Sequence, residues 1–174
     1  MTYTWDAVPT PVGLVVAVFD GSALVSVHLT ETDPLWEIER VSRLLFETPV
    51  HEPGAAHELA RQVDEYFAGT RRSFDLNLDW RLTGSGFTRA ALQAITEIPY
   101  GETISYGAIA GLAGRPRAAR AVGSACRTSP FSLVVPVHRV VRSDGSVGEY
   151  GSTPDIKKFL IDLERQTLEA ASAA

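Results

Sequence analysis

Two short helical segments joined by a glycine turn constrain this chain more than any other feature. The spacing predicts a helix from Ser105 to Leu112, a turn at Ala113 and Gly114, and a second helix from about Pro116 to Arg127. This is the helix-turn-helix pattern. Separations of three, four and three residues place four side chains on one face: Arg117, Arg120, Ser124 and Arg127. The rest of the second segment is almost all small residues, which allow close approach to a groove or close packing against another helix.

The charge of the chain is unevenly distributed around this motif. Its 174 residues carry a formal net charge of −5, yet the segment from Thr103 to Ser143 contains six arginines and no acidic residue. The remainder holds ten basic and 21 acidic residues. An acidic body with one basic segment is typical of a localised anion-binding face. Arginines that solvate an exposed helix would give the same composition.

The composition indicates a globular protein without a disulfide framework or a metal cluster. Hydrophobic residues make up 45% of the chain and charged residues 21%, and no apolar run approaches 18 residues, so we expect no membrane partner. The single cysteine, Cys126, excludes an internal disulfide, and with four scattered histidines it predicts no metal and no cofactor. The first residues lack the basic and apolar regions of a secretion signal, so we expect a cytoplasmic protein.

Residues 1–82 are predicted to form a small structural domain of sheet and helices. Asp20-Gly21 separates two alternating apolar runs, Leu14–Phe19 and Leu24–Leu29, which together predict a β-hairpin. Three further elements are expected from their periodicity: helices over Pro34–Phe46 and Ala55–Phe67, and a strand over Phe74–Leu78.

Residues 83–174 are predicted to form a second, mainly helical domain after a linker at Leu82–Gly86. A helix is expected over Phe87–Ile98, a second hairpin around Ser143–Ser146, and a C-terminal helix that opens at Thr153-Pro154-Asp155. The C-terminal helix is predicted to bury four side chains: Ile156, Phe159, Leu160 and Leu163. The predicted fold class is therefore α+β, a small antiparallel sheet with helices followed by a helix-turn-helix domain.

Several motifs in this order resemble the O6-alkylguanine-DNA alkyltransferases. They are Ile98–Glu102, Ser105-Tyr106-Gly107, Arg115–Gly123, Pro136–Val141 and Gly148-Glu149-Tyr150, with Thr10–Gly13 and Glu65–Gly69 in the first domain. The resemblance implies a small N-terminal domain and a helical domain that enters the minor groove of DNA through its helix-turn-helix. It also implies that a damaged guanine is flipped into a pocket, where its alkyl group moves irreversibly to a cysteine.

The same resemblance implies roles for single residues. Arg120 would fill the gap left by the extruded base, and Tyr106 would help to rotate the nucleotide and donate a hydrogen bond to the base. The other expected DNA-binding residues are Ser105, Arg117, Ser124 and Arg127, and the expected base pocket contains Val137, Tyr150, Gly151 and Cys126. The implied partner is double-stranded DNA containing O6-alkylguanine, together with other repair proteins. We expect a monomer that is associated with the nucleoid when bound to DNA.

The chain departs from this family at the chemical centre. The family has Pro-Cys-His-Arg, whereas this chain has Pro136-Val137-His138-Arg139. His138 and Glu164 match the histidine and glutamate that activate the family's cysteine through a water. Valine has neither a lone pair nor an ionisable proton, so the family reaction cannot occur at Val137. Ser129 also replaces the asparagine that usually precedes the proline at this turn.

Three functions are compatible with this departure. The first is a lesion binder that transfers nothing, similar to the alkyltransferase-like proteins, or an inactive Cys-to-Val variant. Those proteins usually carry tryptophan at position 137 and often lack the N-terminal domain. The second is an alkyltransferase with Cys126 as a relocated acceptor, although free cysteine is commonly buried. The third is a homologue repurposed for small molecules, against which the retained Arg120 and Tyr106 argue. We favour the first, without enzymatic activity.

Overall fold

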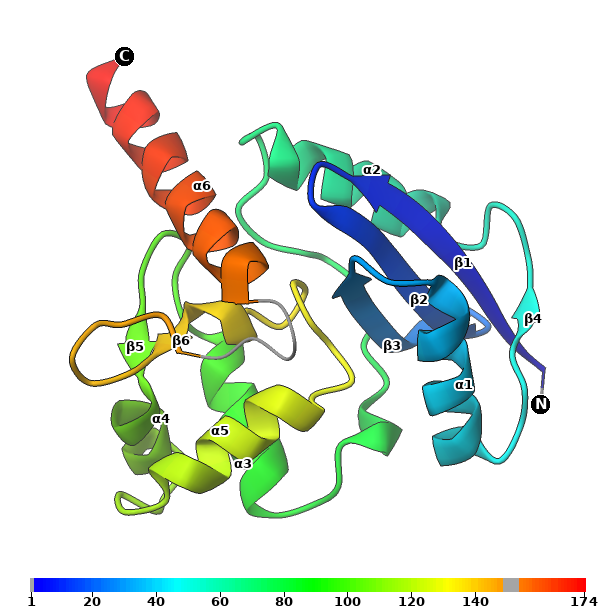
Figure 1. Ribbon diagram of the computed structural model, residues 1–174, viewed down its shortest axis with the longest axis horizontal. Coiled ribbons are helices and arrows are strands. Elements are labelled where there is room, and N and C mark those ends of the chain that lie inside the picture. The colour runs from blue at the N-terminus through cyan, green and yellow to red at the C-terminus, as the bar shows by residue number, and fades with distance from the viewer. Residues whose placement is uncertain (1, 149–153) are drawn as a thin grey trace. The chain divides into compact units, whose positions relative to one another are not determined.

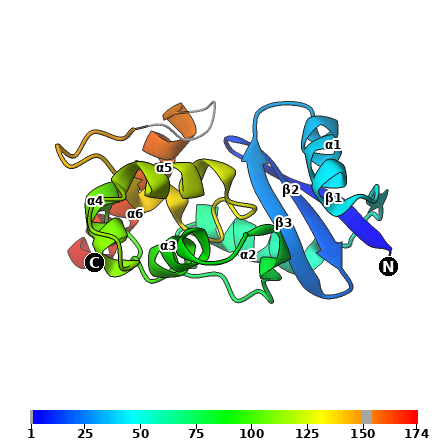
Figure 2. The ribbon, with the colours of Figure 1, turned by 90° about the horizontal axis from the view of Figure 1, so that it is seen from below.

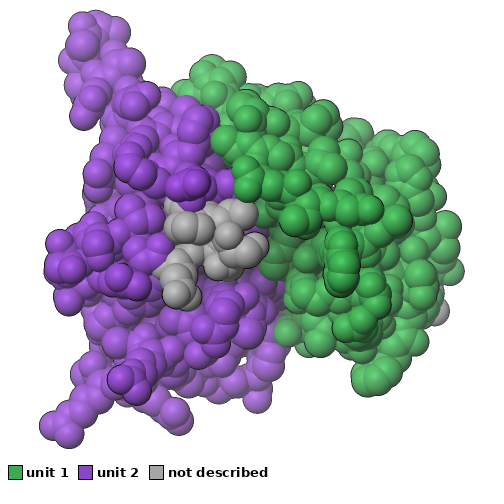
Figure 3. Space-filling model, viewed as in Figure 1, with its two compact units in different colours: residues 1–82 green, residues 83–174 purple. Residues whose placement is uncertain are grey.

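A computed structural model describes residues 2–148 and 154–174 of the chain (Figure 1). The chain divides into two compact units, residues 1–82 and residues 83–174, which Figure 3 shows in different colours. The boundary falls beside the glycine-containing segment that is predicted to be a linker. One unit is a sheet with helices and the other is mainly helical, so the predicted α+β class is confirmed.

The first unit is built on a sheet with the strand order β3-β2-β1-β4 (Figure 1). The strands are β1 (Tyr3–Thr10), β2 (Gly13–Asp20), β3 (Ala23–Thr30) and the short β4 (Val50–His51). Antiparallel pairing joins β1 to β2 and β2 to β3, whereas β4 pairs parallel with β1. The predicted hairpin at Asp20-Gly21 is confirmed, and Gly21 takes a φ of 58°, a left-handed conformation that glycine adopts without steric cost.

Two helices cover the sheet of the first unit from opposite sides (Figure 2). They are α1 (Pro34–Leu45), which begins at the cap Asp33, and α2 (His57–Phe67); a 3-10 turn, η1 (Trp80–Leu82), follows. Ile38 and Val41 of α1 pack with Val16 and Val18 of β2 in one buried cluster. Side chains alternate along a strand, so the neighbouring residues of β2, which are also buried, face the other side.

The predicted strand over Phe74–Leu78 is wrong. This segment meets β3 only at an isolated bridge, with the Leu24 and Asp79 amides each making one hydrogen bond of 2.8 Å to the neighbouring backbone. The backbone of Asp75 is instead bound by the buried side chain of Gln62, whose Nε2 donates to the Asp75 carbonyl at 2.9 Å and whose Oε1 accepts from the Asp75 amide at 2.8 Å. An amide side chain thus takes the place of a partner strand.

The second unit combines helices with a short parallel strand pair. Its helices are α3 (Phe87–Thr96), α4 (Tyr106–Leu112), α5 (Ala119–Thr128) and the long α6 (Pro154–Ala173), with a 3-10 turn η2 (Val137–Arg139) between α5 and α6. Strand β5 (Ile104–Ser105) pairs parallel with β6 (Val140–Val141), side by side in Figure 1. This pairing holds the residues before α4 beside those that follow η2.

Three predictions for the second unit need correction. The second helix of the motif begins at Ala119 and not near Pro116, because Pro116 lies in a turn closed by the Ala118 amide and the Arg115 carbonyl at 3.0 Å. The second hairpin is not found among the described residues: a turn follows β6, but β6 pairs with β5, and Val147 and Gly148 form no strand. Glu149 and Tyr150, the other residues of its expected second arm, lie outside the described residues.

The buried stripe of α6 also differs from the apolar pattern. Phe159 is 41% exposed, whereas Lys157, Ile161 and Glu164 are buried beside Ile156 and Leu160. Lys157 and Glu164 can be buried because the interior of this unit holds polar partners for them. The spacing of apolar residues does not predict such partners.

Candidate functional site

The site centres on a buried turn that presents residue 137. Val137 is the first residue of η2 and is 3% exposed, and its amide donates to the Val135 carbonyl at 2.7 Å. The Arg139 amide donates to the Pro136 carbonyl at 2.9 Å, which closes the turn. Val137, His138 and Arg139 are therefore all held inside the second unit.

One carboxylate on α6 binds the two residues that follow Val137. His138 Nε2 lies 2.8 Å from Glu164 Oε1, so the structure brings together the two predicted relay residues. Arg139 completes the cluster, since its Nε and Nη2 donate to the two Glu164 oxygens at 2.9 Å each. The Gly101 amide donates to Glu164 Oε2 at 3.0 Å, and Arg139 Nη1 donates to the Ile98 carbonyl at 2.7 Å.

The electrostatics of this cluster fix its protonation. Burial opposes ionisation of Glu164, but the hydrogen bond from His138 and the hydrogen bonds and charge of Arg139 outweigh it and hold the pKa of Glu164 well below its usual range. Burial lowers the pKa of His138, against the hydrogen bond and charge of Glu164, and the charges of Arg139 and Lys157 lower it further. The cluster is therefore a carboxylate, a neutral imidazole and a guanidinium.

The neutral imidazole has a defined orientation. Because the Glu164 carboxylate only accepts hydrogen bonds, Nε2 of His138 carries the ring hydrogen and Nδ1 keeps its lone pair. Nδ1 is buried and has no hydrogen-bond partner among the described residues. His138, the residue after Val137, thus keeps a free lone pair on Nδ1, while the valine side chain has no proton to give up.

Lys157 of α6 is a buried cation that was not predicted from the sequence. It is 1% exposed, and its Nζ donates to the Val140 carbonyl at 2.6 Å and to the Tyr106 hydroxyl at 3.2 Å. Burial lowers the pKa of Lys157 to about 8. Lys157 lies seven residues before Glu164 on the same helix, and residues seven apart lie on the same helix face. This spacing is the sequence signal that could have predicted its burial.

The predicted DNA-binding residues lie on or near α4 and α5. Ser105 caps α4 by accepting a hydrogen bond from the Ala108 amide at 3.1 Å, which fixes the helix start where Tyr106 is the first residue. Arg120, Ser124 and Arg127 are exposed on α5, opposite its buried Val122 and Ala125. Arg127 Nη2 lies 3.4 Å from Ser124 Oγ, so these two share an edge of the helix.

Arg117 lies outside the helix that it was predicted to extend. It is exposed in the turn before α5, where Arg115, Pro116, Arg117 and Ala118 line an open hollow of about 410 Å³. Gly114, with a φ of 89°, supplies the left-handed turn that ends α4 and leads into this segment. The arginine-bearing surface therefore comprises the turn and one face of α5.

Three further residues were expected in the base pocket: Cys126, Tyr150 and Gly151. Cys126 is partly buried on α5, and burial raises the pKa of its thiol to about 12, although the charge of Lys157 acts in the opposite direction. Such a thiol is protonated at neutral pH and a poor nucleophile, because the thiolate is the reactive form. Tyr150 and Gly151 lie outside the described residues.

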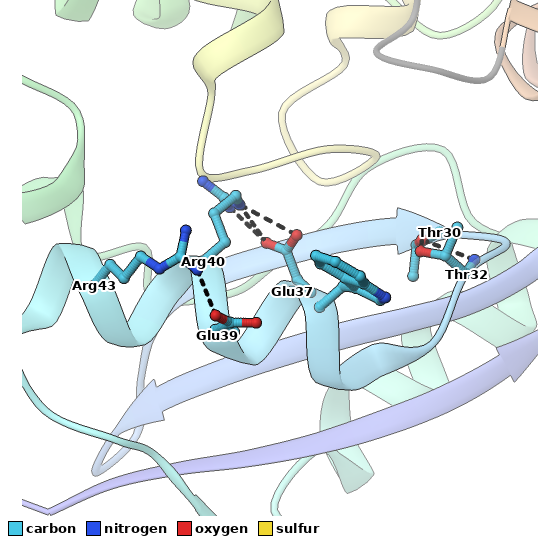
Figure 4. A pocket seen from close by; sticks show the side chains of 7 residues that line it. Thr30, Thr32, Glu37, Glu39, Arg40 and Arg43 are labelled. Atoms are coloured by element: carbon cyan, nitrogen blue, oxygen red, sulfur yellow. Dashed lines mark hydrogen bonds and ion pairs between the residues drawn. The ribbon is translucent and has the colours of Figure 1, made fainter.

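A separate hollow of about 330 Å³ lies on the first unit, and Figure 4 shows its side chains. It is lined by Thr30, Thr32, Trp36, Glu37, Glu39, Arg40 and Arg43. Its arginines are paired, Arg40 with Glu37 and Arg43 with Glu39. Within residues 2–148 and 154–174, no group of three or more histidine, cysteine or acidic residues could hold a metal ion, and no helix is long and apolar enough to cross a membrane.

Comparison with known proteins shows which family this chain belongs to. The family profile described as "6-O-methylguanine DNA methyltransferase, DNA binding domain" matches residues 86–166. The methylated-DNA–protein-cysteine methyltransferase of Mycobacterium leprae (strain TN) is 39% identical over 156 residues, which cover 90% of this chain and 88% of that protein. This chain belongs to the O6-methylguanine-DNA methyltransferase family. The resemblance seen in the motifs is thereby confirmed.

Solved structures of the family share the fold over nearly the whole chain. The crystal structure of Mycobacterium tuberculosis O6-methylguanine methyltransferase matches with a TM-score of 0.81 and 33% identity, covering 95% of this chain and 94% of that one. Mycobacterium tuberculosis OGT in complex with DNA matches with a TM-score of 0.79 and 34% identity, covering 96% and 94%. Within this family, Val137 stands where the acceptor cysteine is expected.

Proposed function

We propose that this chain binds double-stranded DNA containing O6-alkylguanine and flips the damaged base into its second unit without accepting the alkyl group. The observation that carries this proposal is the combination of Val137 with an intact His138–Glu164 pair. Valine cannot form the bond to carbon that alkyl transfer requires, whereas the arginines expected to contact DNA, Arg117, Arg120 and Arg127, are exposed.

The cationic surface of the second unit supports the DNA-binding part of the proposal. Arg120 and Arg127 project from a helix whose other residues are small, so its backbone can approach a groove of DNA closely. In the proposed complex α5 enters the minor groove and Arg120 fills the gap in the base stack. Flipping a base costs a few kcal/mol of stacking, which such an inserted side chain partly offsets.

A relative whose solved structure contains DNA supports DNA binding by this chain. Mycobacterium tuberculosis OGT, which covers nearly all of this chain, was crystallised in complex with DNA. We infer that this chain acts in DNA repair as a lesion-recognition protein, which leaves the bound lesion to other repair proteins. It would act as a monomer.

The experiment is a binding titration with two short duplexes that differ only in one O6-methylguanine, followed by intact-mass measurement of the protein. We expect tighter binding to the lesion duplex and an unchanged protein mass. Equal affinity for both duplexes would contradict lesion recognition, and a gain of one methyl mass would contradict a role without transfer.

A further inference from the structure

The outer face of α1 in the first unit exposes several apolar side chains. Seven large apolar side chains are exposed among the described residues, and five of them lie on α1 or shortly after it: Leu35, Trp36, Leu44, Phe46 and Val50. Trp36 is 70% exposed and Phe46 is 96% exposed. A concentration of exposed apolar side chains on a globular protein marks a surface that contacts another molecule.

Phe46 is held in a conformation that an isolated chain does not favour. It ends α1 with a φ of 55° and a ψ of 24°, a left-handed conformation that glycine usually takes at this position. The conformation costs free energy for a bulky residue, and a ring exposed to water gains nothing from burial in return. Strain of this kind is concentrated at functional positions. Phe46 is therefore expected to contact another molecule.

Four side chains of this face have a spacing that is symmetric under reversal of the helix. Trp36, Glu39, Arg43 and Phe46 are separated by three, four and three residues, so they lie along one side of α1 and its last turn. When a second α1 runs antiparallel to the first, position 39 lies opposite position 43, and position 36 lies opposite position 46. Glu39 then faces Arg43 of the other copy, and Trp36 faces Phe46.

The charges of this face suit the antiparallel arrangement. The first unit has 13 acidic and six basic residues, so two copies repel each other unless opposite charges meet where they touch. The arrangement gives two contacts between Glu39 and Arg43, related by the two-fold axis of the pair. In a single chain these side chains pair with each other but are 56% and 73% exposed, so both are accessible to a second copy (Figure 4). A parallel arrangement would place Glu39 against Glu39.

We propose that the outer face of α1 is a self-association surface, and that its occupant is a second copy of this chain with the two α1 helices packed antiparallel. This inference goes beyond the proposed function, in which a single copy recognises a lesion. Because α1 has only 12 residues, contact between two such helices belongs to the class of small interfaces, below about 1,200 Å², that give weak complexes. The chain is therefore a monomer when dilute and pairs when concentrated.

The hollow of about 330 Å³ on the first unit lies beside this face. Trp36, Glu39 and Arg43 line it, together with Thr30 and Thr32. In the antiparallel pair, Phe46 of the second copy lies over Trp36 at the border of the hollow. Aromatic rings in contact are stabilised beyond the area that they bury, so this contact at each end of the pair supplements the charge contacts at its centre.

The test is sedimentation of the full chain from about 1 μM to about 1 mM, under reducing conditions that exclude a disulfide through Cys126. We expect a monomer–dimer equilibrium. Glu39→Arg and Arg43→Glu should each weaken dimerisation about tenfold, because each places like charges opposite one another at both contacts. An equimolar mixture of the two variants should recover the parent's dimerisation, because every contact then joins opposite charges.

Two further variants separate a lost contact from a damaged fold. Asp162→Arg is the matched control, since Asp162 forms an exposed pair with Lys158 on α6 that has the same spacing of four residues, and it should leave dimerisation unchanged. Phe46→Gly should weaken dimerisation about tenfold and also raise the midpoint of thermal unfolding, because glycine takes the left-handed conformation without strain.

Four outcomes would overturn the inference. The parent protein could remain a monomer up to about 1 mM. Glu39→Arg and Arg43→Glu could dimerise as strongly as Asp162→Arg, which would assign the contact to another surface. The mixture of the two charge variants could dimerise no more strongly than its components, which would exclude the antiparallel register. A folded Phe46→Gly variant with the parent's dimerisation would remove the aromatic contact on which the pairing depends.

Discussion

His138 Nε2 lies 2.8 Å from Glu164 Oε1 across 26 residues of sequence, beside a valine that has no proton for the pair to remove. The carboxylate, the imidazole and the guanidinium of Arg139 satisfy one another in the interior of the second unit. Under the proposed function, these are the residues that would activate a nucleophile, and residue 137 has none to activate. This makes the chemistry of residue 137 directly testable.

Val137→Cys should convert the protein into a single-turnover alkyl acceptor. The neutral His138 has a buried Nδ1 with no partner among the described residues, which could assist removal of a proton from a thiol at position 137. Incubation with the O6-methylguanine duplex should add one methyl mass to the peptide that contains residue 137. Val137→Ala, which has no nucleophile, is the matched control and should stay unmodified.

The contribution of His138 can be measured in the same background. In a Val137→Cys protein, His138→Ala should slow transfer by about 100-fold or more, the size expected for loss of a positioned base. Transfer at an unchanged rate would show that the buried pair only supports the structure. An unmodified Val137→Cys protein that still binds the lesion would show that the pocket no longer places the alkyl group beside residue 137.

Glu164 should dominate the acid stability of the second unit. Its pKa is lower in the folded state than its ordinary value of 4.5, so its contribution is complete above that value and is lost as the pH falls toward the folded-state pKa. His138 acts in the same direction, because its lowered pKa means that the unfolded chain takes up a proton first as the pH falls below 6.5.

The measurement is chemical denaturation of the parent and a Glu164→Gln variant at several pH values. The variant leaves Arg139 buried without its counter-ion, so we expect a loss of about 3–5 kcal/mol at neutral pH. The difference between the two proteins should shrink as the pH falls through the acid range. A constant difference at all pH values would contradict the assigned ionisation of Glu164.

Local signals in the sequence are sufficient for much of the fold. Asp20-Gly21 predicts the hairpin because few residue pairs suit that turn, and the small-residue segment around Arg120 predicts the exposed face of α5 from helical spacing alone. The relay pair His138 and Glu164 came from the resemblance, because contacts between residues so far apart in sequence leave no trace in local spacing.

The parts of the fold and of the site that could not be predicted from the sequence depend on buried polar side chains. Gln62 replaces a partner strand for Asp75, and Lys157 lies in a helix stripe where the apolar pattern suggested Phe159. The partners of Lys157 are 17 and 51 residues away, so no window of the sequence contains the contact that makes its burial favourable. Arg139 was missed as the third member of the Glu164 cluster for the same reason.

Cys126 should not accept alkyl groups. Burial raises the pKa of its thiol to about 12, so the fraction present as thiolate at neutral pH is very small. After prolonged incubation with the O6-methylguanine duplex, the peptide that contains Cys126 should have its unmodified mass. A methylated Cys126 peptide would revive the relocated-acceptor hypothesis, and an undamaged duplex is the control for adventitious alkylation.

Arg120→Ala should weaken lesion preference more than Arg142→Ala does. Both side chains are exposed, but Arg120 lies on the proposed groove-facing side of α5, whereas Arg142 precedes the turn after β6. Loss of a side chain that fills the base stack penalises the flipped complex, whereas loss of a cation near the phosphates weakens binding to damaged and undamaged duplexes alike. Titrations of both duplexes at several salt concentrations separate these effects. Affinity should fall steeply with salt for all three proteins, and equal changes in preference for the two variants would count against insertion of Arg120.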